Sequence, residues 1–399
     1  MADFIPPDRH EGASINGESR PAARKAARNK KPPPRPSRQP GQAKNPSPAP
    51  PPLWSAPEVV DQPVNRQAYA AIDLGTNNCR LLIARPSGEN FTVIDAFSRV
   101  VRLGEGLAQT GRLSEKAMDR ALAALKVCAD KLTRRNVRLA RSVATEACRR
   151  AENGDEFIER VRQETGILLD VITAQEEARL AVLGCHILLE EGTGPAMIFD
   201  IGGGSTELVL IEQGGPVPSI LDWQSVPWGV VSLTESCGDE AATYELRAAR
   251  YAQMRQLVFD SFLTFRERIG SVELPHLRLL GTSGTVTTLA SLHLDLPQYD
   301  RKAVDGLIVP ADSMRQISQD LATMSPEERR ALPCIGNERA DLVVAGCAIL
   351  ESILDIWPAT RLGVADRGIR EGILRSLITA DSEGERSRQA LRRQKRGPA

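Results

Sequence analysis

One pattern occurs twice in this chain and restricts its possible folds more than any other feature. The segment AIDLGTNNCRLLIA (71–84) aligns without a gap on FDIGGGSTELVLI (199–211), with Asp73 opposite Asp200. Each copy consists of a strand-like run, an acid, a polar turn that contains glycine, and a second strand-like run. The repeat therefore predicts two similar domains, each with one glycine-containing hairpin, and a cleft between them.

Around both copies, short β-rich runs alternate with helical patterns, which predicts an α/β fold. The predicted helices are residues 114–136 and 174–191. The predicted strands are AYAAID (68–73), CRLLIA (79–84), FTVIDAF (91–97), RSVAT (141–145), LLDVIT (168–173), AMIFDI (196–201), TELVLI (206–211) and LRLLGT (277–282). A chain of 399 residues exceeds the usual size of one domain, and we expect one domain at 67–180 and another at 181–378.

Both ends of the chain have the composition of disordered basic tails. Residues 1–60 carry ten Lys or Arg against five Asp or Glu, and residues 1–66 contain 15 of the 27 prolines. Such segments bury too little apolar surface to offset the entropy of ordering, so we expect tails at 1–66 and 379–399. The residues between them are net acidic, which does not favour a groove for specific nucleic-acid binding.

The cysteines and histidines exclude several other classes of protein. The seven cysteines are scattered without a CxxC pair, which argues against a disulfide framework or a zinc site and favours a reducing cytoplasm. The four histidines form no HExxH or HD motif, which argues against histidine-based metal hydrolysis and a Ser-His-Asp triad. No apolar run approaches the length of a membrane span, so we expect no membrane association.

The two repeated turns have the composition of phosphate-binding loops. Glycines permit positive φ and let backbone N–H groups approach phosphate oxygens closely. Side-chain donors are Thr76, Asn77 and Asn78 in the first turn and Ser205 and Thr206 in the second. A carboxylate would repel phosphate, so Asp73 and Asp200 are predicted to hold a divalent cation, Mg²⁺. The alternative is two ordinary hairpins, which the pairing of the motif makes less favoured.

Two further segments contain candidate phosphate ligands. LLGTSGTVTTLA (279–290) leads from a predicted strand into a helix, whose N-terminus can bind an anion. Arg149 and Arg150 follow the predicted strand RSVAT. An arginine there suits phosphate oxygens, although two solvated arginines at the start of a helix are commoner.

The helix predicted at 174–191 begins with an acidic pair, Glu176 and Glu177. Neighbouring side chains on a helix diverge by about 100°, so only one of the two can face a cleft. A carboxylate in that position can orient and deprotonate an attacking water. The alternative is that the pair complements the helix dipole.

Taken together, these segments resemble the exopolyphosphatase and guanosine pentaphosphate phosphohydrolase (Ppx/GppA) family. IDLGTNNCRLLIA, ACRR, AQEEAR, FDIGGGSTELVLI, LGTSGT and GVADRGIREGIL occur in the family's order within about 68–375. The family belongs to the superfamily of actin, sugar kinases and heat-shock ATPases. The resemblance implies two ribonuclease-H-like domains that flank a phosphate and Mg²⁺ cleft, as in the short members of the family.

The resemblance also implies roles for individual residues. Glu177 matches the family's catalytic base, and Arg149 matches the arginine that binds the terminal phosphate. The acids that match the metal-linked positions are Asp73, Asp200 and Glu207. The implied phosphate-binding residues are Gly75, Thr76, Asn77, Arg80, Gly202, Gly203, Gly204, Ser205, Gly281, Thr282, Ser283 and Gly284. This chain has Asn78 and Cys79 where the family often has a serine and an aromatic residue.

We therefore expect a cytoplasmic, homodimeric exopolyphosphatase that uses Mg²⁺ to release terminal orthophosphate from inorganic polyphosphate. Hydrolysis of guanosine pentaphosphate is the first alternative. An ATP-dependent kinase or an actin-like nucleotide switch is more distant, because nothing in the sequence indicates a sugar pocket. A non-enzymatic scaffold that binds polyphosphate or RNA through the basic tails is the third alternative.

Overall fold

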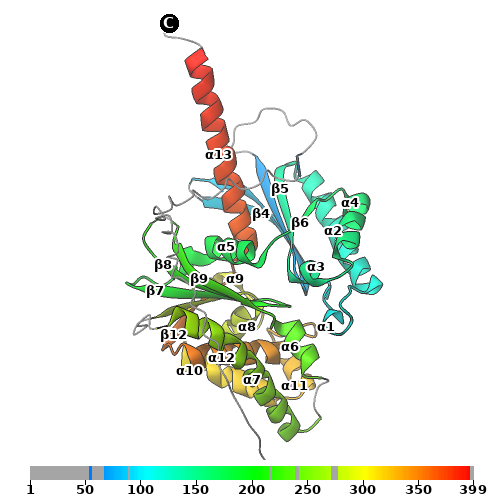
Figure 1. Cartoon of the computed structure of the whole chain (residues 1–399), viewed down its shortest axis with the longest axis vertical. Coiled ribbons are helices and arrows are strands. Elements are labelled where there is room, and N and C mark those ends of the chain that lie inside the picture. Colours follow the sequence, from blue (N-terminus) through cyan, green and yellow to red (C-terminus); the bar gives the residue numbers. More distant parts are fainter. Residues whose placement is uncertain are drawn as a thin grey trace, which may run out of the picture. The chain divides into compact units, whose positions relative to one another are not determined.

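Two six-stranded sheets, which share the order of five of their strands, form the framework of the protein (Figure 1). The computed structural model describes residues 54–55, 67–88, 90–215, 217–238, 242–270 and 277–395, which all lie within one unit of the chain, Ala49–Ala399. The strands of the first sheet are β1 (Trp54–Ser55), β2 (Ala68–Leu74), β3 (Asn78–Ser87), β4 (Asn90–Val100), β5 (Val137–Ala144) and β6 (Leu169–Val171). Those of the second are β7 (Pro195–Ile201), β8 (Thr206–Glu212), β9 (Ser219–Val226), β10 (Arg278–Thr282), β11 (Ile308–Pro310) and β12 (Arg361–Ala365).

The strand directions confirm the predicted fold class. In the first sheet the order is β4-β3-β2-β5-β6, and in the second it is β9-β8-β7-β10-β12. In each sheet the first three strands of this order form an antiparallel meander. The next two strands run parallel to β2 in the first sheet and to β7 in the second. This is the ribonuclease-H arrangement, present twice. The predicted strands all lie at, or overlap with, observed strands.

Helices cover the faces of both sheets. Those of the first half are α1 (Leu107–Thr110), α2 (Glu115–Arg134), α3 (Glu146–Arg150), α4 (Gly154–Thr165) and α5 (Ala174–Cys185), followed by a 3-10 turn at His186–Leu188. The helices that follow along the chain are α6 (Val230–Ser236), α7 (Tyr244–Ile269), α8 (Gly284–His293), α9 (Arg301–Val304), α10 (Ala311–Thr323), α11 (Pro326–Ala331), α12 (Val343–Ile356) and α13 (Ile369–Lys395). Ser114 and Thr173 cap α2 and α5, the two predicted helices, by accepting hydrogen bonds from backbone N–H groups.

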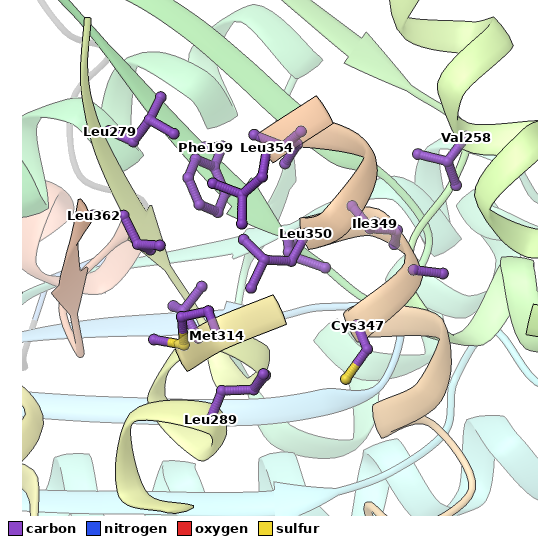
Figure 2. Close-up of a cluster of buried hydrophobic side chains, with 14 of the residues drawn as sticks. Phe199, Val258, Leu279, Leu289, Met314, Cys347, Ile349, Leu350, Leu354 and Leu362 are labelled. Atoms are coloured by element: carbon purple, nitrogen blue, oxygen red, sulfur yellow. The ribbon is translucent and has the colours of Figure 1, made fainter. Parts of the chain in front are cut away.

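Each sheet has its own hydrophobic core. α2 packs an apolar stripe that includes Leu122 and Leu125 on one face of the first sheet. In the second core, α12 is buried over almost its whole length, and Figure 2 shows its Leu350 and Leu354 beside Phe199 of β7. Burial of apolar side chains on this scale is the main stabilising term for both halves.

Helix α5 joins the two halves. Its Leu180 and Ala181 pack in a cluster with β2, β3 and α13, whereas its Ala178 and Val182 pack in a cluster with β7 and β8. Figure 1 shows α5 between the two sheets. Because Glu176 and Glu177 lie in its first turn, this contact with both sheets fixes their positions.

The structure corrects three predictions about domain boundaries. Residues 379–395 belong to α13 and are not an unstructured tail. The start of α13 packs on the first sheet through Ile373, Leu374 and Leu377, so residues 369–378 do not belong with the second domain. Within the expected N-terminal tail, β1 pairs with β5, and the other residues of 1–66 lie outside the described residues. The basic composition of residues 379–399 indicated a tail, although the few apolar residues of α13 have the spacing of a helix.

No helix among the described residues is both long and apolar enough to cross a membrane.

The start of α13 is fixed by a buried carboxylate, and this gives the first prediction. Glu371 accepts hydrogen bonds from the Gly368 N–H (3.0 Å) and from Arg301 Nη2 (2.9 Å). Burial alone would raise the pKa of Glu371, but Arg370, the Gly368 N–H and Arg301 outweigh it and lower the pKa. A depressed carboxylate pKa stabilises the folded state above the unfolded pKa, and this contribution is lost as the pH falls through the folded pKa.

We expect Glu371→Gln to destabilise the protein by about 1–3 kcal/mol at pH 7, because hydrogen bonds to a charged group become neutral ones. The difference in melting temperature between variant and wild type should narrow below about pH 4.5, where the carboxyl takes up a proton in the unfolded state while it is still ionised in the folded state. Thermal denaturation at pH 7 and pH 4 measures both values. An equal destabilisation at the two pH values would contradict the role of the charge.

Candidate active site

The two repeated turns have the same backbone geometry. In the β2–β3 hairpin the Gly75 N–H donates to the Asn78 carbonyl (2.9 Å), and in the β7–β8 hairpin the Gly202 N–H donates to the Ser205 carbonyl (3.0 Å). The two hairpins have the same strand register but pair different side chains. Asp73 lies opposite Arg80 in the first hairpin. In the second, Asp200 lies opposite Glu207, so that two acids replace an acid and a base.

Neighbouring elements hold the carbonyl groups of both turns. The carbonyls of Gly202 and Gly203 accept hydrogen bonds from Val230 N (3.0 Å) and Val231 N (2.7 Å) at the start of α6. In a planar trans peptide the carbonyl and the following N–H point in opposite directions. The N–H groups of Gly203 and Gly204 therefore point away from α6, and among the described residues they donate to no acceptor.

The first turn is fixed in the same way by the segment after β4. The carbonyls of Thr76 and Asn77 accept hydrogen bonds from Gly104 N (2.9 Å) and Val101 N (2.8 Å). The Asn77 N–H consequently points away from this segment. Together the two turns present free backbone N–H groups, which form a cradle suited to the oxygens of an anion.

The glycines of the second turn allow the two turns to touch. A Cβ atom on Gly203 would lie 3.0 Å from Asn77 N, and one on Gly204 would lie 2.8 Å from Thr76 Oγ1. None of the glycines of either turn has positive φ. The freedom for positive φ is therefore not used in these turns, and close approach is the physical reason for Gly203 and Gly204.

Both turns open into a single cavity of about 1160 Å³, with open solvent at its mouth included. Fifteen of the predicted site residues line it: Asp73, Gly75, Thr76, Asn77, Arg80, Glu177, Asp200, Gly202, Gly203, Gly204, Ser205, Glu207, Thr282, Ser283 and Gly284.

Two predicted residues do not line the cavity. Gly281 lies within β10, where a Cβ atom would be 2.6 Å from Phe199 Cζ, so this glycine is explained by packing and not by phosphate binding. Arg149 is the other, and its Nη1 donates to the Ile172 carbonyl (2.8 Å) and to Glu177 Oε2 (3.1 Å).

The adjacent acids of α5 have different surroundings. Glu177 is 7% exposed and lines the cavity. Burial raises its pKa well above the ordinary value, Glu207 raises it further, and Arg149 opposes both effects. Glu176 instead accepts hydrogen bonds from Arg141 Nη1 (2.9 Å) and Arg179 Nε (2.7 Å) and does not line the cavity.

Three other carboxyl groups that line the same cavity also have raised pKa values. Burial raises the pKa of Asp73, an effect that Arg80 and Arg370 reduce. Burial likewise raises the pKa of Asp200. The pKa of Glu207 rises to about 7, because of burial and then of Asp200, although the Ser205 and Ser225 hydroxyls donate to its Oε1 (2.7 and 2.8 Å).

The oxygen donors of the cavity fit a hard divalent cation. Asp73, Asp200 and Glu207 supply carboxylate oxygens, and Asn77 Oδ1 is a buried amide oxygen without a hydrogen-bond partner among the described residues. Within the same described ranges, no three Asp, Glu, His or Cys side chains are grouped so that they could hold a metal ion by themselves. Mg²⁺ commonly takes one or two carboxylates and completes its coordination with water and phosphate oxygens. The donors therefore suit a site that a bound phosphate helps to complete.

Sequence reasoning missed several residues of the cavity. Glu146 at the start of α3 accepts a hydrogen bond from Thr76 Oγ1 (3.0 Å) and one from Arg150 Nη1 (2.8 Å). Arg370 of α13 lines the cavity without a hydrogen bond or ion pair to another described residue, and burial lowers its pKa. The remaining missed residues include Thr145, Thr285, Thr288, Arg339, Asp366, Arg367 and Gly368. The signal for Arg367 and Arg370 was their position just after β12, because the carboxyl ends of parallel strands meet at one edge of a sheet.

Comparison with known proteins gives consistent matches. A model of the Ppx/GppA phosphatase family matches residues 82–380. The chain is 33% identical over 325 residues to exopolyphosphatase 2 of Mycobacterium tuberculosis. The aligned region covers 77% of this chain and 98% of that protein. A Ppx/GppA family member from Aquifex aeolicus has 30% identity and a TM-score of 0.64, covering 79% of this chain and 98% of its own. An exopolyphosphatase from Cytophaga hutchinsonii has 25% identity and a TM-score of 0.69, with 78% and 98% covered.

Proposed function

Because the chain belongs to the Ppx/GppA phosphatase family, we propose that it is an exopolyphosphatase that releases terminal orthophosphate from inorganic polyphosphate, with Mg²⁺ as cofactor. One observation carries this proposal: both glycine turns and the buried carboxylate of Glu177 face a single cavity. The relative from Mycobacterium tuberculosis that carries the name exopolyphosphatase supports the choice of substrate.

The cavity offers separate groups to the phosphates of the chain. The N–H groups of Asn77, Gly203 and Gly204, which donate to no acceptor in the described part of the chain, are suited to the oxygens of the terminal phosphoryl group. Arg80 and Arg370 line the same cavity and are suited to the phosphates that follow. A polyanion is favoured over a single phosphate because cavity arginines such as Arg80 and Arg370 remain after the cradle is filled.

Glu177 is the proposed base. Its carboxylate accepts a proton from a water, whose oxygen forms a bond to the terminal phosphorus while the bond from phosphorus to the bridging oxygen breaks. The products are orthophosphate and a polyphosphate one unit shorter. Arg149 donates to Glu177 Oε2 and so favours the ionised form that the step requires.

Asp73, Asp200 and Glu207 are the proposed metal-holding residues. When bound, Mg²⁺ neutralises negative charge on the phosphoryl oxygens. Without such a cation the buried acids of the cavity would repel a polyanion.

Guanosine pentaphosphate is the second candidate substrate. The cavity continues past the turns to Leu342 and Val343 of the second half. Apolar side chains at that end are better suited to a nucleoside than to a phosphate chain. The two substrates share the terminal reaction and differ in what fills this end of the cavity.

The proposed reaction is tested by incubating the full chain with Mg²⁺ and polyphosphate, guanosine pentaphosphate or ATP, and measuring released orthophosphate. We expect the highest kcat/KM for polyphosphate. A preference for guanosine pentaphosphate would change the substrate but not the reaction. Turnover of ATP alone would overturn the proposal in favour of a kinase or a nucleotide switch.

Two finer attributes belong to the same proposal. We propose a cytoplasmic location, which the seven free cysteines support because disulfides are rare in a reducing compartment. The homodimer stays a prediction, which the elution volume of the full chain would test.

Activity is expected to require a divalent cation. Excess chelator should abolish phosphate release, and Asp200→Asn should raise the Mg²⁺ concentration needed for half-maximal rate as well as slow the reaction. Titration of Mg²⁺ against initial rate measures both effects. Full turnover in excess chelator would contradict the roles assigned to Asp200 and Glu207.

A further inference from the structure

Ser283, between β10 and α8, has a backbone conformation that its side chain disfavours. Its φ of 81° is the largest positive value among the described non-glycine residues. With a ψ of −175°, it lies in a region that glycine alone adopts freely. A residue remains in such a conformation only where its surroundings compensate for the strain.

The Ser283 hydroxyl also does not make the hydrogen bond that a serine at this position usually makes. It occupies the N-cap of α8, where a serine hydroxyl normally accepts a hydrogen bond from a backbone N–H of the first turn. No such side-chain bond is present in α8. A glycine would avoid the backbone strain, so neither the turn nor the helix explains a serine here.

The Ser283 hydroxyl instead forms a hydrogen bond with a residue of the neighbouring strand β7. Ser283 Oγ donates to Asp200 Oδ1, and the preceding Thr282 pairs with Asp200 in the register of β10 and β7. Within the described part of the chain, this is the hydrogen bond that holds the Asp200 carboxylate, and Oδ2 accepts none. Glu207 is held comparably by the hydroxyls of Ser205 and Ser225.

We propose that Ser283 is a positioning residue, whose hydroxyl fixes one oxygen of Asp200 so that the other is presented to a divalent cation in the cavity. The inference deepens the proposed function, because it concerns the same metal-holding acids. The backbone strain at Ser283 is then the cost of placing a hydroxyl where a glycine would fit better. Asp200 without this bond would keep its burial but lose its fixed orientation.

Two substitutions separate the hydroxyl from the backbone strain. Ser283→Gly and Ser283→Ala both remove the hydroxyl, but only glycine relieves the strain. Direct titration with Mn²⁺ in the presence of saturating inorganic phosphate, followed by electron paramagnetic resonance, measures cation binding without turnover. Thermal denaturation in chelator measures stability.

We expect both variants to bind Mn²⁺ about tenfold more weakly than the wild type, the factor typical for loss of a residue that orients a ligand. Ser283→Gly should melt at a higher temperature than Ser283→Ala. Wild-type affinity for Mn²⁺ in both variants would overturn the inference. So would an affinity that follows the melting temperature, with Ser283→Gly near wild type and Ser283→Ala weakened, because the effect would then be structural.

The same experiment distinguishes this inference from the proposed function. If the wild type releases no phosphate from polyphosphate but both variants lose Mn²⁺ affinity, the positioning role stands and the proposed substrate fails. If the wild type hydrolyses polyphosphate and both variants bind Mn²⁺ normally, the function stands and the positioning role fails.

Discussion

Replacing Glu177 by Gln is expected to lower the turnover of polyphosphate by about 10²–10⁴-fold, the usual contribution of a positioned acid or base. The substitution keeps the size of the side chain and leaves an amide oxygen to accept the Arg149 bond (3.1 Å). It removes the carboxylate that accepts a proton from water. Initial rates at saturating polyphosphate measure the loss.

Binding of polyphosphate should survive Glu177→Gln. The cradle of N–H groups and the cavity arginines are unchanged, and the lost carboxylate only repelled the polyanion. KM should therefore stay near the wild-type value while kcat falls. A large rise in KM with unchanged kcat would show that Glu177 contributes to binding and not to the chemical step.

Glu176→Gln is the matched control, since it makes the same change one residue earlier on α5. Glu176 does not line the cavity, and its carboxylate pairs with Arg141 and Arg179. We expect turnover close to wild type, with a loss of stability of about 1 kcal/mol or less from these part-exposed pairs. If Glu176→Gln is the inactive variant, the assignment of the helix face is wrong. If both variants keep full turnover, another group activates the water.

The duplicated hairpin made the fold predictable from sequence alone. Two gapless copies of a strand, turn and strand place Asp73 and Asp200 at equivalent points, and the observed registers of β2–β3 and β7–β8 agree with this alignment. The choice of Glu177 over Glu176 rested on the family resemblance. Helical geometry alone required only that the two side chains diverge.

The rest of the cavity depends on contacts between distant segments, which no local pattern contains. Arg370 enters the site because α13 returns to the first sheet through Ile373 and Leu374. The sequence also predicted phosphate binding by Gly281, but this position requires a small residue because of the neighbouring ring of Phe199. Among the site residues, positive φ occurs at Ser283 and not at the glycines of the two turns.

Gly229, which lies outside every motif of the sequence, closely approaches the backbone of the second turn. It precedes α6, and a Cβ atom there would lie 2.4 Å from Gly203 C and 2.5 Å from Gly204 N, which are backbone atoms of the second turn. Its φ of −120° and ψ of 179° suit any residue, so the contact alone opposes a side chain. Backbone atoms cannot rotate away as a flexible side chain can, so the turn or α6 must move.

We expect Gly229→Ala to reduce kcat/KM for polyphosphate by about 10²-fold, because a displacement near 1 Å in a group that positions substrate has this effect. The loss of stability from overpacking should be about 1–3 kcal/mol. Gly214→Ala is the matched control, since a Cβ atom on Gly214 meets nothing within 4 Å, and it should retain full activity. Initial rates and thermal denaturation of both variants measure these effects. Wild-type kcat/KM in Gly229→Ala would show that the second turn tolerates displacement, and its N–H groups would then not be the cradle for the terminal phosphate.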